Sequence, residues 1–288
     1  SVSIGSVSNP FYIGSYIGGN NFDGYIDEFR VVKGTAVYTG DFNVPTSRLT
    51  AITNTKLLIH SDQSIDSSTP EYPITVSGAV PSTTNKLGGS SWYFNASADE
   101  LKVERIPSFS TNNFTIEMWF KVNSATTWGH HWDSRTSDNT EGFAIGINSS
   151  SKMWVWYNGS FRITGTTNVT TGWHHVAYVR SGNDHKLYLD GVQEGSTYNS
   201  NNNYTSTIAH IGKYYYTNND GFIGYIDELR VSNNARYSQA SDLTSYISSP
   251  SVFSSDNNTT LLIHGDGAKF DDSSTSDHTI TPTGSYHT

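Results

Sequence analysis

Apolar and polar residues alternate along much of this chain. The stretch Phe114-Thr-Ile-Glu-Met-Trp-Phe-Lys-Val122 puts its apolar side chains on one face and Glu117, Trp119 and Lys121 on the other. Glu100–Val103 alternates in the same way. A period of two residues predicts half-buried strands. The strands are short and are separated by turn signals such as Asp190-Gly191, which predicts an antiparallel β-sandwich.

One stretch of eight residues occurs twice. Gly24-Tyr-Ile-Asp-Glu-Phe-Arg-Val31 returns as Gly224-Tyr-Ile-Asp-Glu-Leu-Arg-Val231, with a single difference. A second pair follows, because Leu57-Leu-Ile-His60 returns as Leu261-Leu-Ile-His264. Two matches at nearly one spacing indicate a repeat unit of about 200 residues.

This repeat suggests a division of the chain into three parts. We expect residues 1–54 to be the C-terminal part of a preceding repeat and residues 55–254 to be a complete domain. Residues 255–288 are then the N-terminal part of a following repeat. A piece of about 50 residues is too short to form a sandwich of its own. We therefore expect the chain to be a section of a longer array, with neighbouring repeats or subunits as partners.

The composition supports an all-β fold and excludes several function classes. Ser, Thr, Asn, Gly and Tyr are abundant and strong helix formers are scarce, although residues 235–246 could form a short helix. The chain has no cysteine, so it has neither disulfides nor thiol chemistry. The formal net charge is −9 and there is no basic stripe, which argues against nucleic acid as a partner. The chain contains no run of 18 apolar residues, so the sequence predicts no membrane-spanning helix.

Four strand motifs occur in a characteristic order. They are the Phe114 strand, Trp173-His-His-Val-Ala177, Leu187-Tyr-Leu-Asp-Gly191 and the Gly224 strand. Over roughly residues 55–250 this order resembles the laminin G-like domains of the concanavalin A-like superfamily. The resemblance implies a jelly-roll β-sandwich of two antiparallel sheets, most often with a binding or adhesive role. Similar copies occur in bacterial surface and bacteriophage structural proteins, which implies an extracellular, cell-surface or virion location.

Two aromatic clusters are candidates for sugar binding. Aromatic rings can stack on the apolar faces of sugar rings, while neighbouring polar groups bind the hydroxyls. Two segments with this composition, 128–135 and 214–220, are expected to be loops. The predicted glycan-binding residues are Trp128, His131, Trp132, Asp133, Arg135, Tyr214, Tyr215 and Asn218. Trp154 and Trp156 share one face of a predicted strand, and we expect them to pack against a neighbouring domain or subunit rather than bind a sugar.

Acidic residues near the repeat boundary suggest a structural calcium site. Calcium prefers several oxygen ligands from carboxylates and carbonyls in turns. Asp62, Asp66 and Asp227 could supply them if the first and last strands of the domain are neighbours. The resemblance also makes calcium plausible. The alternative is that these aspartates are solvated turn residues that bind their own backbone.

The acidic residues do not form a catalytic pattern. A glycanase needs two carboxylates on one side of its groove. Asp227 and Glu228 are adjacent in a strand, so they point to opposite faces, and we expect Glu228 to pair with Arg230. For the same reason the adjacent His174 and His175 are not expected to bind one metal ion.

These observations lead to three ranked functional hypotheses. The first is a non-catalytic adhesion module that binds a glycan or cell-surface polysaccharide. The second is a structural or assembly subunit of a virion or surface filament, without a ligand of its own. The third and weakest is a polysaccharide hydrolase.

Overall fold

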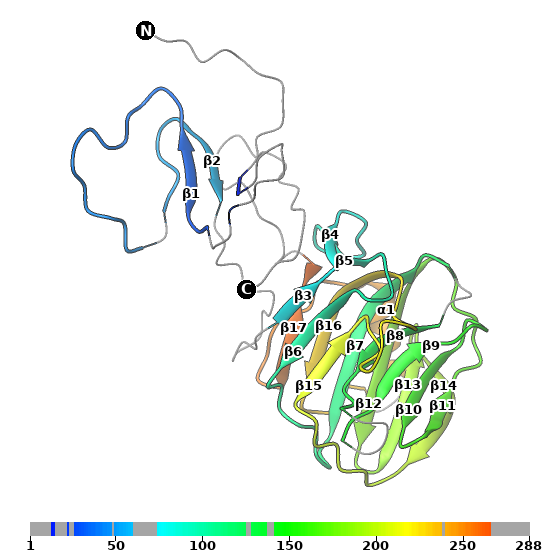
Figure 1. Cartoon of the computed structure of the whole chain (residues 1–288). Helices are drawn as coiled ribbons and strands as arrows, with labels where there is room; N and C mark the ends of the chain where they lie inside the picture. Colours follow the sequence, from blue (N-terminus) through cyan, green and yellow to red (C-terminus); the bar gives the residue numbers. More distant parts are fainter. Residues whose placement is uncertain are drawn as a thin grey trace. The chain divides into compact units, whose positions relative to one another are not determined.

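The computed structural model describes residues 13–14, 22, 26–47, 49–59, 74–124, 128–136, 141–237 and 240–265. These residues belong to two compact units. The first unit contains β1 (Phe29–Val32) and β2 (Thr55–Ile59), which form an antiparallel pair. The second unit contains all the other elements labelled in Figure 1. No described helix is long and apolar enough to cross a membrane.

The second unit is built from two antiparallel sheets. The first sheet has the spatial order β11-β10-β9-β8-β15-β6-β3. Its strands are β3 (Ile74–Ser77), β6 (Glu100–Glu104), β8 (Gly129–Asp133), β9 (Ala144–Ile147), β10 (Met153–Tyr157), β11 (Ser160–Thr164) and β15 (Ile208–Ile211). We call this the front sheet.

The second sheet, the back sheet, has the order β14-β13-β12-β7-β16-β5-β4, with β17 also paired to β16. Its strands are β4 (Val80–Ser82), β5 (Ser91–Phe94), β7 (Phe114–Val122), β12 (Trp173–Ser181), β13 (Asp184–Leu189), β14 (Val192–Asn199), β16 (Gly224–Ser232) and β17 (Thr259–Ile263). The predicted turn at Asp190-Gly191 joins β13 to β14, and both residues have positive φ, 49° and 81°. The all-β sandwich predicted from the sequence is confirmed.

The core lies between the two sheets, as the alternating pattern predicts. Every second residue of β7, from Phe114 to Phe120, is buried in it. Met153 and Val155 of β10 enter the same cluster from the front sheet. Because neighbouring residues of a strand point to opposite faces, the residues between these core positions lie on the outer faces of the sheets.

The chain itself covers part of the outer face of the back sheet. The helix α1 (Ala240–Ser248) follows β16, overlaps the segment 235–246 predicted to be helical and ends two residues beyond it. Leu243 of this helix and Tyr237 pack on Ala177 and Val179 of β12 in a second, smaller apolar cluster. Trp119 Nε1 donates a hydrogen bond to Tyr246 Oη at 2.9 Å. Part of the outer face of the back sheet is therefore buried by a later segment of the same chain.

Each recurring Leu-Leu-Ile strand pairs with the Gly-Tyr-Ile-Asp-Glu strand that precedes it in the chain. β17 pairs with the closing strand β16 of the jelly roll, and β2 pairs with β1 in the first unit. β2 lies in the first compact unit and β17 in the second. The division of the chain into repeats at 54/55 and 254/255 stays a prediction. Sequence similarity locates a repeat, but only hydrogen bonding between strands shows which strands pair.

A β-bulge changes the expected partners of the acidic strand residues. Between Asp227 and Arg230 the register of β16 against β7 shifts, and Glu228 adopts a positive φ of 50°. The predicted pair between Glu228 and Arg230 is wrong. Arg230 instead binds Glu117 of β7, and Glu228 binds His264 at 2.7 Å. A bulge inserts an extra residue and so interrupts the alternation on which the prediction rested.

Candidate functional site

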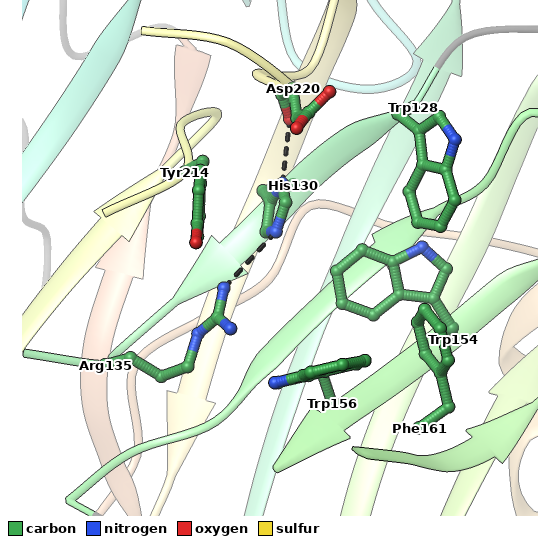
Figure 2. Close-up of a pocket in the computed structure, with 8 residues that line it drawn as sticks. All are labelled: Trp128, His130, Arg135, Trp154, Trp156, Phe161, Tyr214 and Asp220. Atoms are coloured by element: carbon green, nitrogen blue, oxygen red, sulfur yellow. Dashed lines mark hydrogen bonds between the residues drawn. The ribbon is translucent and has the colours of Figure 1, made fainter. Parts of the chain in front are cut away.

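An open pocket of about 310 Å³ lies on the outer face of the front sheet. Its position follows from the strand pattern, because Met153, Val155 and Tyr157 point into the core. The tryptophans between them therefore point outward. The pocket is lined by Trp128, His130, Arg135, Trp154, Trp156, Phe161, Tyr214 and Asp220, which are drawn in Figure 2.

Aromatic rings form one side of this pocket. Trp154 of β10 lies 5.5 Å from Phe161 of β11 and 6.1 Å from Trp128, measured between ring centroids. Phe161 and Trp128 stack at 6.1 Å with an interplanar angle of 28°. Trp128 and Phe161 are both exposed, so an apolar surface faces solvent there. Figure 2 shows these rings gathered on the side of the pocket away from Tyr214.

A glycine under Trp154 makes room for its ring. Gly146 of β9 pairs with Trp154 across the sheet. A Cβ on Gly146 would lie 2.4 Å from Trp154 Cζ2 and 2.3 Å from the carbonyl oxygen of Gly129. Such distances are far inside van der Waals contact, so the ring keeps its position only with glycine beneath it.

Polar groups form the other side of the pocket, with His130 at its centre. His130 Nδ1 lies 2.8 Å from the carbonyl oxygen of Asp220, and its ring stacks on Tyr214 at 4.9 Å. Because a carbonyl oxygen only accepts, Nδ1 carries the hydrogen. Nε2 is then the acceptor for Arg135 Nη2 at 3.3 Å. Burial lowers the pKa of His130, which keeps the ring neutral near pH 7.

Arg135 is held in place by a buried carboxylate. Its Nε and Nη2 donate to the two oxygens of Asp133 at 2.8 and 2.6 Å. Burial by itself would lower the pKa of Arg135, but the hydrogen bonds and charge of Asp133 raise it. The guanidinium carbon also lies 5.2 Å from the ring of Tyr214 and 5.1 Å from that of Tyr215. The polar side therefore contains a fixed cation whose charge is balanced.

Two indole groups bring further donors to the pocket. Trp154 Nε1 and Trp156 Nε1 are buried and have no hydrogen-bond acceptor among the described residues. In Figure 2 the nitrogen of Trp156 lies on the side of the ring nearer Arg135. A buried donor without a partner costs about 1–3 kcal/mol, and in this structure neither nitrogen is open to a ligand.

Three of the predicted glycan-binding residues line the pocket, and the other five do not. Trp128, Arg135 and Tyr214 all line the pocket. Tyr215 contacts Arg135 beside it, and Asn218 is exposed but is not one of the lining residues.

Three residues of the predicted 128–135 loop need correction. This segment contains the strand β8, with an irregular register between His130 and Trp132. His131 and Trp132 are 0% exposed, in contact with core rings, so neither can stack on a ligand. Asp133 is equally buried, and it accepts hydrogen bonds from Arg135 and from the backbone amide of Tyr215.

Several lining residues do not follow from the sequence prediction. His130 and Asp220 lie within the two predicted sugar-binding segments but were not among the predicted residues. Phe161 lies in a third segment that the prediction did not include. The alternation in β10 does place Trp154 and Trp156 on one face, as predicted. However, these tryptophans line the pocket and do not pack against a neighbouring domain within the described structure. The sheet face that the chain partly covers is the outer face of the back sheet, where α1 and Tyr237 pack.

The predicted calcium ligands are only partly described. Asp62 and Asp66 lie outside the described residues. Asp227 Oδ2 accepts hydrogen bonds from the backbone amides of Lys86 and Leu87 at 2.9 and 3.0 Å. Within the part of the chain that the structure describes, no group of three His, Cys, Asp or Glu side chains could hold a metal ion. Calcium stays a prediction.

The family follows from a match to known sequences. The model of the concanavalin A-like lectin/glucanases superfamily matches residues 94–240, which is about half of the chain. The chain belongs to this superfamily. The matched region of this concanavalin A-like domain includes β8, β10 and β11, and with them all the lining residues of the pocket. No curated protein matches the sequence.

Solved structures with a similar fold include domain 4 of an extracellular arabinanase from Geobacillus stearothermophilus, in complex with arabinotriose. It is 19% identical, with a TM-score of 0.47, over 61% of this chain and 87% of that one. A putative carbohydrate-binding protein from Bacteroides ovatus is 17% identical, with a TM-score of 0.42, over 67% and 51%. A heptameric pentraxin from Limulus polyphemus is 15% identical, with a TM-score of 0.43, over 66% and 88%.

Proposed function

We propose that this concanavalin A-like domain is a non-catalytic module that binds a glycan in the front-sheet pocket. The observation that carries the proposal is the division of the pocket into an aromatic side and a polar side. Trp128 and Phe161 offer exposed apolar ring faces, which the buried Trp154 supports, and Arg135 lies on the opposite, polar side. A sugar ring also combines an apolar face with a rim of hydroxyls, and so matches both sides.

The charge of the pocket favours a neutral glycan. The positive charge of Arg135 is paired with Asp133 at 2.6 Å, and burial keeps His130 uncharged. The Asp220 carboxylate in the lining is negative and disfavours an acidic sugar, and it can accept hydrogen bonds from sugar hydroxyls. A neutral polysaccharide on a cell surface would provide such a ligand. The extracellular, cell-surface or virion location stays a prediction.

The carboxylates support a binding role over hydrolysis. Glycoside hydrolysis uses a pair of carboxyl groups about 5–10 Å apart. Among the described residues, Asp220 is the one carboxylate that lines the pocket, and it contacts His130 through its backbone oxygen. Asp133 is buried and paired with Arg135, so it is not available as an acid or base.

A glycan array read with the intact chain tests the proposal. We expect binding to one or more neutral glycans, and a loss of at least tenfold in affinity for Trp154→Ala and for Trp128→Ala. Tyr216→Ala is the matched control, because Tyr216 is exposed and is not among the lining residues. Binding that survives both tryptophan changes would remove the pocket as the site. Release of shorter sugars from a bound glycan would show that the module is catalytic.

A further inference from the structure

The first unit repeats the closing strands of the jelly roll residue by residue. In β1–β2, Phe29 faces Ile59, Arg30 faces Leu58 and Val31 faces Leu57. In β16–β17, Leu229 faces Ile263, Arg230 faces Leu262 and Val231 faces Leu261. Both pairs then shift register at the same place, after Val31 and after Val231. The two strand pairs are therefore the same structure formed twice.

The segments around these strands also agree. Glu28 and Glu228 have φ values of 52° and 50°. The carboxylate of Glu28 accepts a hydrogen bond from the backbone of Leu49, and that of Glu228 accepts one from Phe253. Before the strands, Phe22 N donates to Gly14 O and Phe222 N donates to Gly212 O, both at 2.8 Å. The likeness thus extends beyond the strands themselves.

What differs between the two copies is the burial of their apolar side chains. Phe22 is 59% exposed and its counterpart Phe222 is 1% exposed. Ile26 is 42% exposed, whereas Ile226 is 2% exposed. Phe29 and Val31 are half-buried, whereas Leu229 and Val231 are fully buried. The first unit therefore presents, on its surface, the face that the second unit buries in its core.

The second unit shows what covers this face. Residues 224–226 of β16 pair with β5, and β16 pairs along its length with β7. Arg230 donates to Glu117 of β7 through Nε and Nη2, at 2.9 and 2.8 Å. Among the described residues, β1 pairs only with β2.

We infer that β1 and β2 complete the back sheet of another concanavalin A-like domain. That partner presents two strands like β5 and β7, with a carboxylate facing Arg30 where Glu117 faces Arg230. A second copy of this jelly roll does not fit, because its own β16 fills the place between β5 and β7. The interaction is independent of the front-sheet pocket, and it would join two such domains through the donated pair of closing strands.

A tandem chain tests this inference. An added copy of residues 63–221, which lacks the closing strands, is joined through its residue 221 to residue 22 of the chain. Phe22 then follows the added copy at the position of Phe222. We expect a second folded jelly roll, seen as about twice the unfolding enthalpy in calorimetry. We also expect hydrogen exchange at residues 29–32 to slow to the rate of residues 229–232.

Two variants and one control make the outcome decisive. In the tandem chain, Val31→Asp should unfold the added domain alone, and in the original chain it should leave the melting of the jelly roll unchanged. Arg30→Glu should lower the stability of the added domain, because the new carboxylate faces Glu117. A second change, Glu117→Arg in the added domain, should restore that stability. In the control tandem the added copy comprises residues 63–265 and so keeps its own β16 and β17. This added domain should fold without help from β1 and β2.

The inference fails if the control tandem folds but the added domain of the test tandem stays unfolded. It also fails if the added domain folds equally well with Val31→Asp. Concentration-dependent self-association of the original chain, abolished by Val31→Asp, would identify a second copy as the partner and overturn the inference.

Discussion

Arg230 and Glu117 form a buried ion pair across β16 and β7, in which Arg230 Nε and Nη2 donate to one carboxylate oxygen of Glu117. Glu117 is fully buried, and its other oxygen accepts a hydrogen bond from Tyr237 Oη at 2.7 Å. The pair therefore joins two central strands of the back sheet to the segment that leads into α1. Its geometry depends on the bulge in β16, which aligns Arg230 with Glu117.

Removing the charge of Glu117 should destabilise the jelly roll strongly. Glu117→Gln leaves the Arg230 guanidinium without a counter-charge in a buried position, and such changes cost about 3–5 kcal/mol. Urea unfolding followed by tryptophan fluorescence measures the loss. Glu104→Gln is the control, since it breaks an exposed pair with Lys102 and should cost about 0–1 kcal/mol. Equal losses for the two variants would show that the buried pair contributes no more than the exposed one.

Acid should destabilise the domain partly through His131. Burial among core rings lowers the pKa of His131 to about 3, against about 6.5 in an unfolded chain. The unfolded state therefore binds the proton more readily, so this contribution to stability is complete above pH 6.5 and is lost as the pH falls towards 3. His131→Phe should flatten the pH dependence of the unfolding free energy between pH 6.5 and 4. An unchanged slope would mean that other groups cause the acid sensitivity.

Adding one methyl group beneath Trp154 should disturb the pocket. In Gly146→Ala the new Cβ meets both the indole ring and the backbone of β8, so the ring must move. We expect a loss of about 1–3 kcal/mol in stability and at least a tenfold loss of glycan affinity. Gly172→Ala is the control, because its nearest neighbour would lie at an ordinary distance of 3.5 Å. Near-normal glycan affinity in Gly146→Ala would show that the position of Trp154 is unimportant for binding.

Neutralising Asp133 should change which glycans bind. Asp133→Asn keeps the shape of the side chain but leaves the positive charge of Arg135 uncompensated in the pocket wall. Glycans with a carboxylate, such as uronic acids, should then gain affinity relative to neutral ones. A glycan array at low and high salt measures the ratio. Asp184→Asn, an exposed change on the back sheet, should leave it unaltered. A ratio that stays constant in Asp133→Asn would argue that Arg135 does not face the ligand.

The partners of particular residues show where sequence reasoning reached its limit. The alternation in Phe114–Val122 correctly assigned core and outer positions, because side-chain direction in a regular strand depends only on position. The same rule failed for Glu228 and Arg230, where a bulge breaks the alternation. His131 and Trp132 were predicted to lie in a loop, but they belong to β8, whose register irregularity places both in the core. Bulges form through pairing with a neighbouring strand, and the sequence of one strand does not reveal them.

By itself the sequence determined the all-β class, the family resemblance, the repeated closing strand and the shared face of Trp154 and Trp156. These features depend on local periodicity and on self-similarity, both of which can be read along one dimension. The tertiary structure alone decided which strands are neighbours. It gathered Trp128, His130, Phe161 and Asp220 into one pocket and paired Leu57–Ile59 with Phe29–Val31. It also separated the buried Phe222 from its exposed counterpart Phe22. The reason is that burial and hydrogen-bond partners arise from contacts between distant segments.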